Sequence, residues 1–150
     1  MKDIRWNVMI MSIVIVIFMF NKFFLRPYVL ENEFPEFLNI FVLSFPNLCE
    51  AIVGGLLITN LSLYGKQRFF KTNSNIKDTH IYLFVVLITG IYVILQEFKI
   101  HNLGGTNVYD PFDILFSLIG LIIVSFILFY FKPVISIQKM RKTNDEEQTK

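Results

Sequence analysis

Mostly apolar stretches without a charged residue, each 15 to 18 residues long, occur four times along this 150-residue chain. Shorter segments between them hold most of the charged residues. A helix that crosses the hydrocarbon core of a bilayer needs about 20 mostly apolar residues. The pattern therefore predicts four transmembrane helices, over residues 6–25, 47–64, 80–98 and 111–131.

A fifth uncharged run covers residues 37–49 and contains Pro46. Joined to the range 47–64 it would be too long for one span, and a proline inside a helix removes a backbone hydrogen bond. The run is therefore expected to form a separate, short interfacial or re-entrant helix on the outer side. The predicted fold class is an all-α membrane protein with one transmembrane domain, residues 1–138, and a polar cytoplasmic tail, residues 139–150.

The amino-terminal apolar run could also be the core of a secretory signal, because Lys2 and Arg5 precede it. A cleavable signal needs small residues just after its apolar run, yet the single alanine of the chain is Ala51. The sequence therefore predicts that the run is an uncleaved first transmembrane helix.

Basic residues are distributed unevenly between the two sides of the predicted spans. Eleven of the fourteen fall before the first helix, between the second and third, or after the fourth. The opposite side holds Lys22, Arg26 and Lys99 together with six acidic residues: Glu31, Glu33, Glu36, Glu97, Asp110 and Asp113. Because cytoplasmic loops of membrane proteins are enriched in Lys and Arg, both termini are predicted to be cytoplasmic, in an inner (plasma) membrane.

Composition excludes several other classes of function. Hydrophobic residues make up 54% of the chain, and the net charge is only +2, with the basic residues dispersed over the loops, so nucleic-acid binding has no support. Cys49 is the only cysteine, which excludes an internal disulfide and a cysteine-based metal site. No nucleotide, dinucleotide or hydrolase motif occurs, and neither a cofactor nor a metal is expected.

Polar residues on three predicted helices are expected at one depth, near the outer ends. An ionisable group there is costly unless it is paired or faces a wet cavity. Helical spacing places three residues on one face of each helix: Asn47, Glu50 and Gly54; Thr89, Tyr92 and Gln96; and Asp113, Ser117 and Gly120. The sequence thus predicts an outward-facing polar pocket, with the candidate residues Glu50, Gln96, Glu97, Asp113, Ser117 and Arg26.

Each charged candidate also has a structural interpretation. Asp110 and Pro111 resemble the start of a helix, with Asp113 near its positive dipole end, and Glu50 could have a capping role after Pro46. Glu97 could be solvated at the membrane rim, and Arg26 could either neutralise the acidic residues or extend to phosphate head groups. The glycines and Ser117 also suit close packing between helices. His101 is interpreted as an ordinary loop residue.

The segment from Gln96 to Gly120 resembles the VanZ-like family of small bacterial membrane proteins. The residues that carry the resemblance are Gln96, Glu97, Asp113, Ile114, Ser117 and Gly120. Ser117 stands where the family pattern has asparagine, and the arginine of the family's loop is missing. The family is associated with resistance to the glycopeptide teicoplanin, so the resemblance implies a role in the cell envelope without defining a reaction.

Two functions of different classes are compatible with these features. In the first, the pocket binds or acts on an envelope lipid or a cell-wall component. In the second, the protein is a non-enzymatic accessory or structural subunit that packs against a larger membrane complex. A small transporter is a third possibility, but the chain lacks an evident inverted repeat. Membrane lipids are the expected partners in every case.

Overall fold

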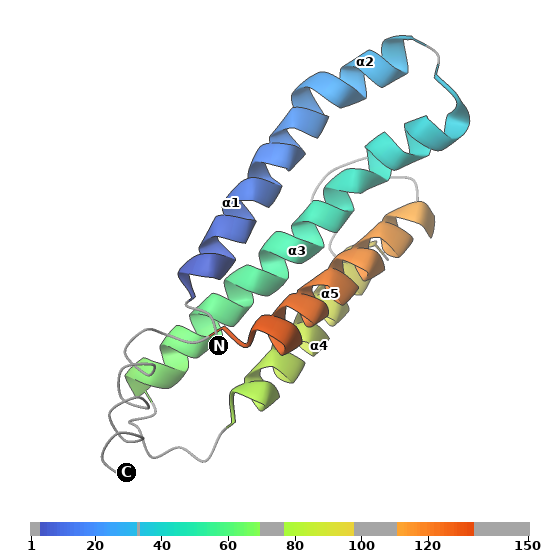
Figure 1. Ribbon diagram of the computed structural model, residues 1–150. Helices are drawn as coiled ribbons and strands as arrows, with labels where there is room; N and C mark the ends of the chain where they lie inside the picture. Colours follow the sequence, from blue (N-terminus) through green and yellow to red (C-terminus); the bar gives the residue numbers. More distant parts are fainter. Residues whose placement is uncertain (1–3, 33, 70–76, 98–110, 134–150) are drawn as a thin grey trace.

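The computed structural model describes residues 4–32, 34–69, 77–97 and 111–133 (Figure 1). The elements are α1 (Arg5–Phe20), the π-helical segment η1 (Asn21–Leu25), α2 (Arg26–Glu31), α3 (Glu36–Phe69), α4 (Asp78–Glu97) and α5 (Pro111–Phe131). The predicted tail, residues 139–150, and the loop that contains His101 and Asp110 lie outside the described residues.

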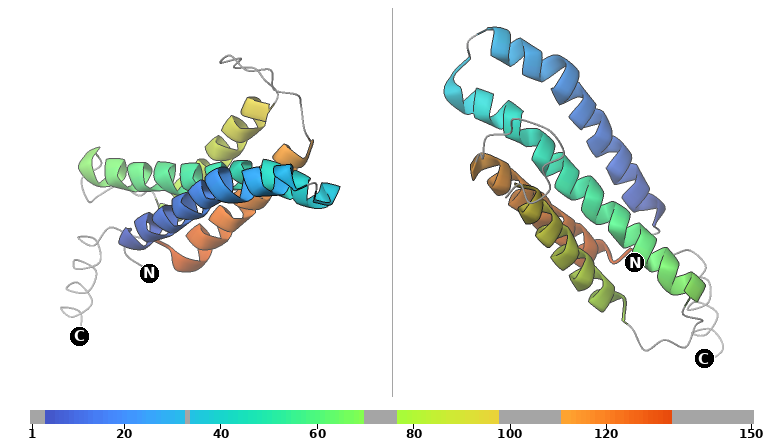
Figure 2. Two further views of the ribbon diagram at one scale, coloured as in Figure 1. Left: turned by 90° about the horizontal axis from the view of Figure 1, so that it is seen from above. Right: turned by 180° about the vertical axis from the view of Figure 1, so that it is seen from behind.

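The protein is an all-α membrane protein, as predicted. Four helical spans in the described part of the chain are long and apolar enough to cross a bilayer: one formed by α1, η1 and α2 together, and one each by α3, α4 and α5. Successive spans run in opposite directions (Figures 1 and 2). The end of the bundle with α2 and the start of α3 is called the hairpin end, and the end where α1 begins and α5 stops is called the terminal end.

The prediction of a separate short helix over residues 37–49 is wrong, because α3 runs without interruption through Pro46. Proline has no N–H, so the carbonyl of Val42, four residues earlier, loses its partner within the helix. The side-chain amide of Asn21 donates a hydrogen bond to this carbonyl at 3.3 Å. A neighbouring helix thus satisfies the group that proline leaves free, which is how membrane helices tolerate proline.

The π-helical segment between α1 and α2 brings Asn21 to this position. Asn21 is 2% exposed, and its carbonyl accepts the backbone N–H of Arg26, five residues later. Pro27 follows directly and cannot donate to the carbonyl of Phe23, so the regular hydrogen-bond pattern is already weakened there. The first span consequently extends beyond the predicted residue 25, as far as Glu31.

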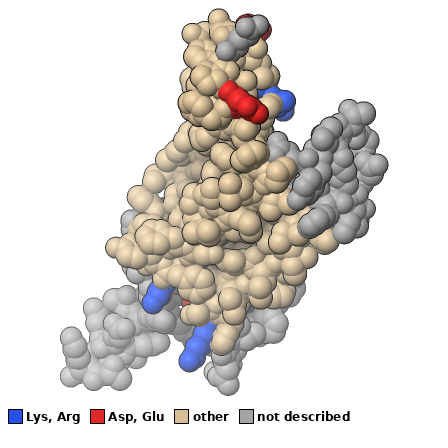
Figure 3. Space-filling model, turned by 90° about the vertical axis from the view of Figure 1, so that its right-hand side faces the viewer, with Lys and Arg blue, Asp and Glu red and all other residues tan. Residues whose placement is uncertain are grey.

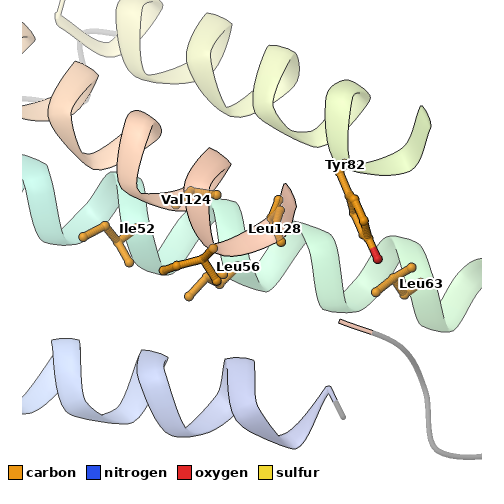
Figure 4. Close-up of a cluster of buried hydrophobic side chains, with 7 residues drawn as sticks. Ile52, Leu56, Leu63, Tyr82, Val124 and Leu128 are labelled. Carbon is orange, nitrogen blue, oxygen red and sulfur yellow. The ribbon is translucent and has the colours of Figure 1, made fainter. Parts of the chain in front are cut away.

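Helix α3 lies at the centre of the fold and contacts each of the other three spans, whereas α1 packs chiefly along α3 (Figure 2). The main apolar cluster joins α3, α4 and α5 (Figure 4) and contains Ile52, Leu56, Leu63, Tyr82, Val124, Ile127 and Leu128. Two glycines allow α3 and α5 to approach closely. A Cβ on Gly120 would lie 2.7 Å from the carbonyl oxygen of Leu48, and a Cβ on Gly55 would lie 2.9 Å from Val124 Cγ1.

Hydrogen bonds and an ion pair between polar side chains also join neighbouring spans. Between α1 and α3, Asn7 donates a hydrogen bond to Asn60 at 2.9 Å. At the terminal end, Lys66 and Asp78 form an ion pair of 2.7 Å between α3 and α4. On the described part of the face in Figure 3, charged side chains lie toward the two ends, and the band between them has neither colour. This distribution fits a bundle whose middle lies in hydrocarbon.

Candidate functional site

A cavity of about 160 Å³ lies between α3, α4 and α5, in the half of the bundle nearer the hairpin end. Its lining consists of Asn47, Glu50, Gly54 and Ile58 from α3, Thr89, Tyr92, Val93 and Gln96 from α4, and Ser117 from α5. A volume of this size holds a small polar group such as the head of a lipid, but not a large substrate.

The helical repeat explains why these residues meet. Asn47, Glu50 and Gly54 are spaced by three and four positions, so they form one face of α3, and Thr89, Tyr92 and Gln96 do the same on α4. Both faces were identified from the sequence. Their juxtaposition depends on the packing of α3 beside α4 and α5, which the sequence pattern does not specify.

A hydrogen bond joins two of the predicted candidates across the cavity. Gln96 Nε2 on α4 donates to Glu50 Oε2 on α3 at 3.4 Å. The bond is long, and both side chains are exposed in the described residues. Glu50 therefore lies at the mouth of the cavity, where a further donor can reach its carboxylate.

Thr89 and Ser44 carry buried side-chain hydroxyls without a hydrogen-bond partner, and of these two Thr89 lines the cavity. Its side chain is 1% exposed, and no described group forms a hydrogen bond with its Oγ1. By contrast, the hydroxyls of Ser12, Thr59 and Ser125 each donate to the carbonyl four residues earlier, at 2.7 to 2.9 Å. A buried hydroxyl without a partner is costly, so Thr89 is an unsatisfied polar group in the cavity wall.

Asp113, Glu97 and Arg26 are the predicted candidates that do not appear in the cavity lining. Asp113 is half-buried in the first turn of α5, a position that suits the positive end of the helix dipole. Glu97 is the last residue of α4, and its side chain lies outside the described part of the structure. Arg26 is exposed at the start of α2, which packs against η1 and α3. Their roles in a site stay predictions.

The apolar part of the wall was not anticipated. Ile58 and Val93 line the cavity together with the polar residues. Ile58 lies four positions after Gly54, one turn beyond the predicted face of α3, and Val93 lies four positions after Thr89, within the predicted face of α4. They give the cavity a mixed lining, in which Thr89 and Ser117 are buried beside Val93 and the exposed Glu50 and Gln96 lie at the mouth.

The lining has one acidic residue, Glu50, and no Lys, Arg or His among the described residues. Among all the residues that the structure describes, no group of three or more His, Cys, Asp or Glu side chains is placed to hold a metal ion. The arrangement is suited to binding a group that donates hydrogen bonds to a carboxylate and to hydroxyls.

The chain matches no protein-family model, and comparison with curated proteins and with solved structures likewise finds no match. The resemblance to the VanZ-like family therefore stays a prediction from the residues quoted above.

Proposed function

We propose that the protein binds the polar part of an envelope lipid or cell-wall component in the cavity between α3, α4 and α5. The observation that carries the proposal is the unsatisfied hydroxyl of Thr89 in the wall of a cavity whose mouth holds Glu50 and Gln96. Polar groups at membrane depth are costly, and a ligand that pairs with the polar residues of the cavity lining would offset this cost.

The resemblance to the VanZ-like family, in the segment that contains Gln96 and Ser117, supports a role in the bacterial cell envelope. A binding function needs no catalytic constellation, and the lining offers one carboxylate without a histidine or a nucleophile beside it. We therefore propose binding rather than a defined reaction.

Filling the cavity tests this function. A Cβ on Gly54 would meet no heavy atom within 4 Å, so the side chain of Gly54→Leu has room to enter the cavity without displacing the bundle. We expect it to lower the occupancy of co-purified lipid, measured by native mass spectrometry, by about tenfold or more, because the site becomes sterically blocked.

Gly65→Leu is the matched control for the cavity-filling variant. Gly65 lies on the same helix, and a Cβ there also meets no heavy atom within 4 Å, but the residue does not line the cavity. This control should retain the lipid occupancy of the unsubstituted protein. Equal occupancy in Gly54→Leu and Gly65→Leu would contradict the proposed function.

We further propose that the protein lies in the plasma membrane with both termini cytoplasmic, so that the cavity is in the outer half of the bilayer. The distribution of basic residues supports this orientation. Cys49 is the only native cysteine and is buried, so an introduced cysteine can be labelled selectively. We expect a membrane-impermeant maleimide to label Asn32→Cys in intact cells, but Lys77→Cys only after permeabilisation. The reverse result would invert the topology.

A second function, that of an accessory subunit, is favoured by one observation. In the span formed by α1, η1 and α2, only 6% of the most apolar 18-residue stretch is buried inside the protein, compared with 39% in α3. Much of its apolar surface could therefore contact another membrane protein instead of lipid. Extraction in mild detergent followed by native mass measurement separates the two functions, since an obligate subunit should carry a different polypeptide with it.

A further inference from the structure

The charge of the cavity restricts what can bind there. Glu50 is its one acidic residue, and no described lining residue is basic. A phosphate or carboxylate ligand would be repelled by Glu50 and would find no cation to neutralise it. At membrane depth this repulsion is stronger than in water, because the effective dielectric constant is lower. The cavity therefore favours a cation over an anion.

The hydrogen-bonding groups restrict the ligand further. Glu50 accepts one long bond, from Gln96 to its Oε2, and no described residue donates to its Oε1. Thr89 contributes a hydroxyl without a partner, and Ser117 contributes a second hydroxyl from α5. A primary ammonium has three N–H donors and therefore needs three acceptors, and Glu50, Thr89 and Ser117 offer acceptors from three different helices around the cavity.

A quaternary ammonium fits less well. It has no N–H donor, and proteins usually recognise it with a cage of several aromatic rings. Tyr92 is the one aromatic residue among the described lining residues. A choline head group would thus leave Thr89 and the Glu50 carboxylate without hydrogen-bond donors.

The position of the mouth favours a lipid as the source of the ammonium. Tyr92 is 63% exposed on the side of α4, five positions before the helix ends at Glu97, or about 8 Å along its axis. Tyrosines at this depth are typical of the boundary between hydrocarbon and head groups. Tyr92 thus places the cavity beside a surface of α4 that lipid head groups can contact.

Resting on the proposed function, we propose that the cavity recognises the primary ammonium of an amine-bearing lipid head group, with Glu50 as its counter-ion and Thr89 and Ser117 as hydrogen-bond acceptors. This assignment explains both the single carboxylate at the mouth and the unpaired hydroxyl in the wall. It also gives Gln96 a role, because its bond to Glu50 holds the carboxylate at the mouth.

A head-group series tests the proposal on the purified full-length protein in detergent. Phosphatidylethanolamine, its N-methyl and N,N-dimethyl forms, phosphatidylcholine and phosphatidylglycerol are each titrated, and binding is measured by native mass spectrometry. We expect affinity to fall with each added methyl group and to be lowest for phosphatidylglycerol. Equal affinity for phosphatidylethanolamine and phosphatidylcholine would overturn the ammonium assignment.

Two substitutions locate the interaction. Glu50→Gln should weaken binding of phosphatidylethanolamine by about tenfold or more and binding of phosphatidylcholine by less, since the choline group loses only a charge attraction and no charge-assisted hydrogen bond. Thr89→Val should weaken the binding of phosphatidylethanolamine by about threefold, because it removes one hydrogen-bond acceptor. Thr59→Val is the matched control, because the hydroxyl of Thr59 bonds to Gly55 within its own helix and lies outside the cavity. Unchanged discrimination between the two lipids in Glu50→Gln would overturn the proposal.

Free ethanolamine, added as a competitor, separates the two possible sources of the ammonium. We expect it to displace phosphatidylethanolamine only at a large molar excess. Displacement at equal concentrations would overturn the assignment to a lipid. If Gly54→Leu abolishes lipid binding while Glu50→Gln binds all five lipids normally, the cavity function stands and the ammonium assignment fails. If Gly54→Leu also binds normally, the proposed function itself fails.

Discussion

Gly120→Ala should lower the free energy of unfolding by about 2 kcal/mol, the typical cost of overpacking a tight contact. The added methyl group would lie 2.7 Å from the carbonyl oxygen of Leu48 and 2.8 Å from the Cβ of Ala51. Since the carbonyl belongs to the backbone of α3, it cannot rotate away, and α3 and α5 must separate. Reversible unfolding from lipid–detergent micelles by added SDS measures this change.

Gly90→Ala is the control for the effect of alanine itself. A Cβ on Gly90 would lie 3.5 Å from Leu121 Cδ1, which is ordinary van der Waals contact with the end of a flexible side chain. This variant should have unchanged or slightly higher stability, because alanine favours the helix over glycine. If Gly120→Ala is as stable as Gly90→Ala, the close approach of α3 and α5 at Gly120 is not what holds them together.

The effect of replacing Asn21 should depend on Pro46. In the presence of Pro46, Asn21→Leu removes the bond to the Val42 carbonyl, which then has no other described partner. With Pro46→Ala, the backbone N–H of residue 46 can bond to this carbonyl within α3, so the loss of Asn21 costs less. We expect a coupling free energy of about 1 kcal/mol, measured by a double-mutant cycle of SDS unfolding.

The cycle isolates this contact from other consequences of the Asn21 substitution. Asn21 Oδ1 is buried without a described partner, so Asn21→Leu also removes the free-energy cost of burying this oxygen. This gain is the same whether residue 46 is proline or alanine, so it cancels in the cycle. Additive effects of the two substitutions would show that Asn21 does not compensate for the proline. Asn7→Leu, which breaks a different contact between α1 and α3, should be additive with Pro46→Ala.

The continuation of α3 through Pro46 illustrates a limit of local sequence patterns. Pro46 and the length of the apolar run both pointed to a break, because an isolated helix cannot replace the hydrogen bond that proline removes. The partner that replaces it, Asn21, lies in a different span and reaches Val42 only through the π-helical segment. No pattern within residues 37–64 contains that information.

The sequence by itself determined the all-α membrane fold and the faces of α3 and α4 that carry polar residues. Each of these properties depends on the apolar length of a helix or on its 3.6-residue repeat, both of which are local. Only the tertiary structure decided that Glu50 meets Gln96, that Thr89 is buried without a partner and that Asp113 lies outside the cavity lining. These outcomes depend on how α3, α4 and α5 pack against one another, and the repeat within each helix does not set that packing.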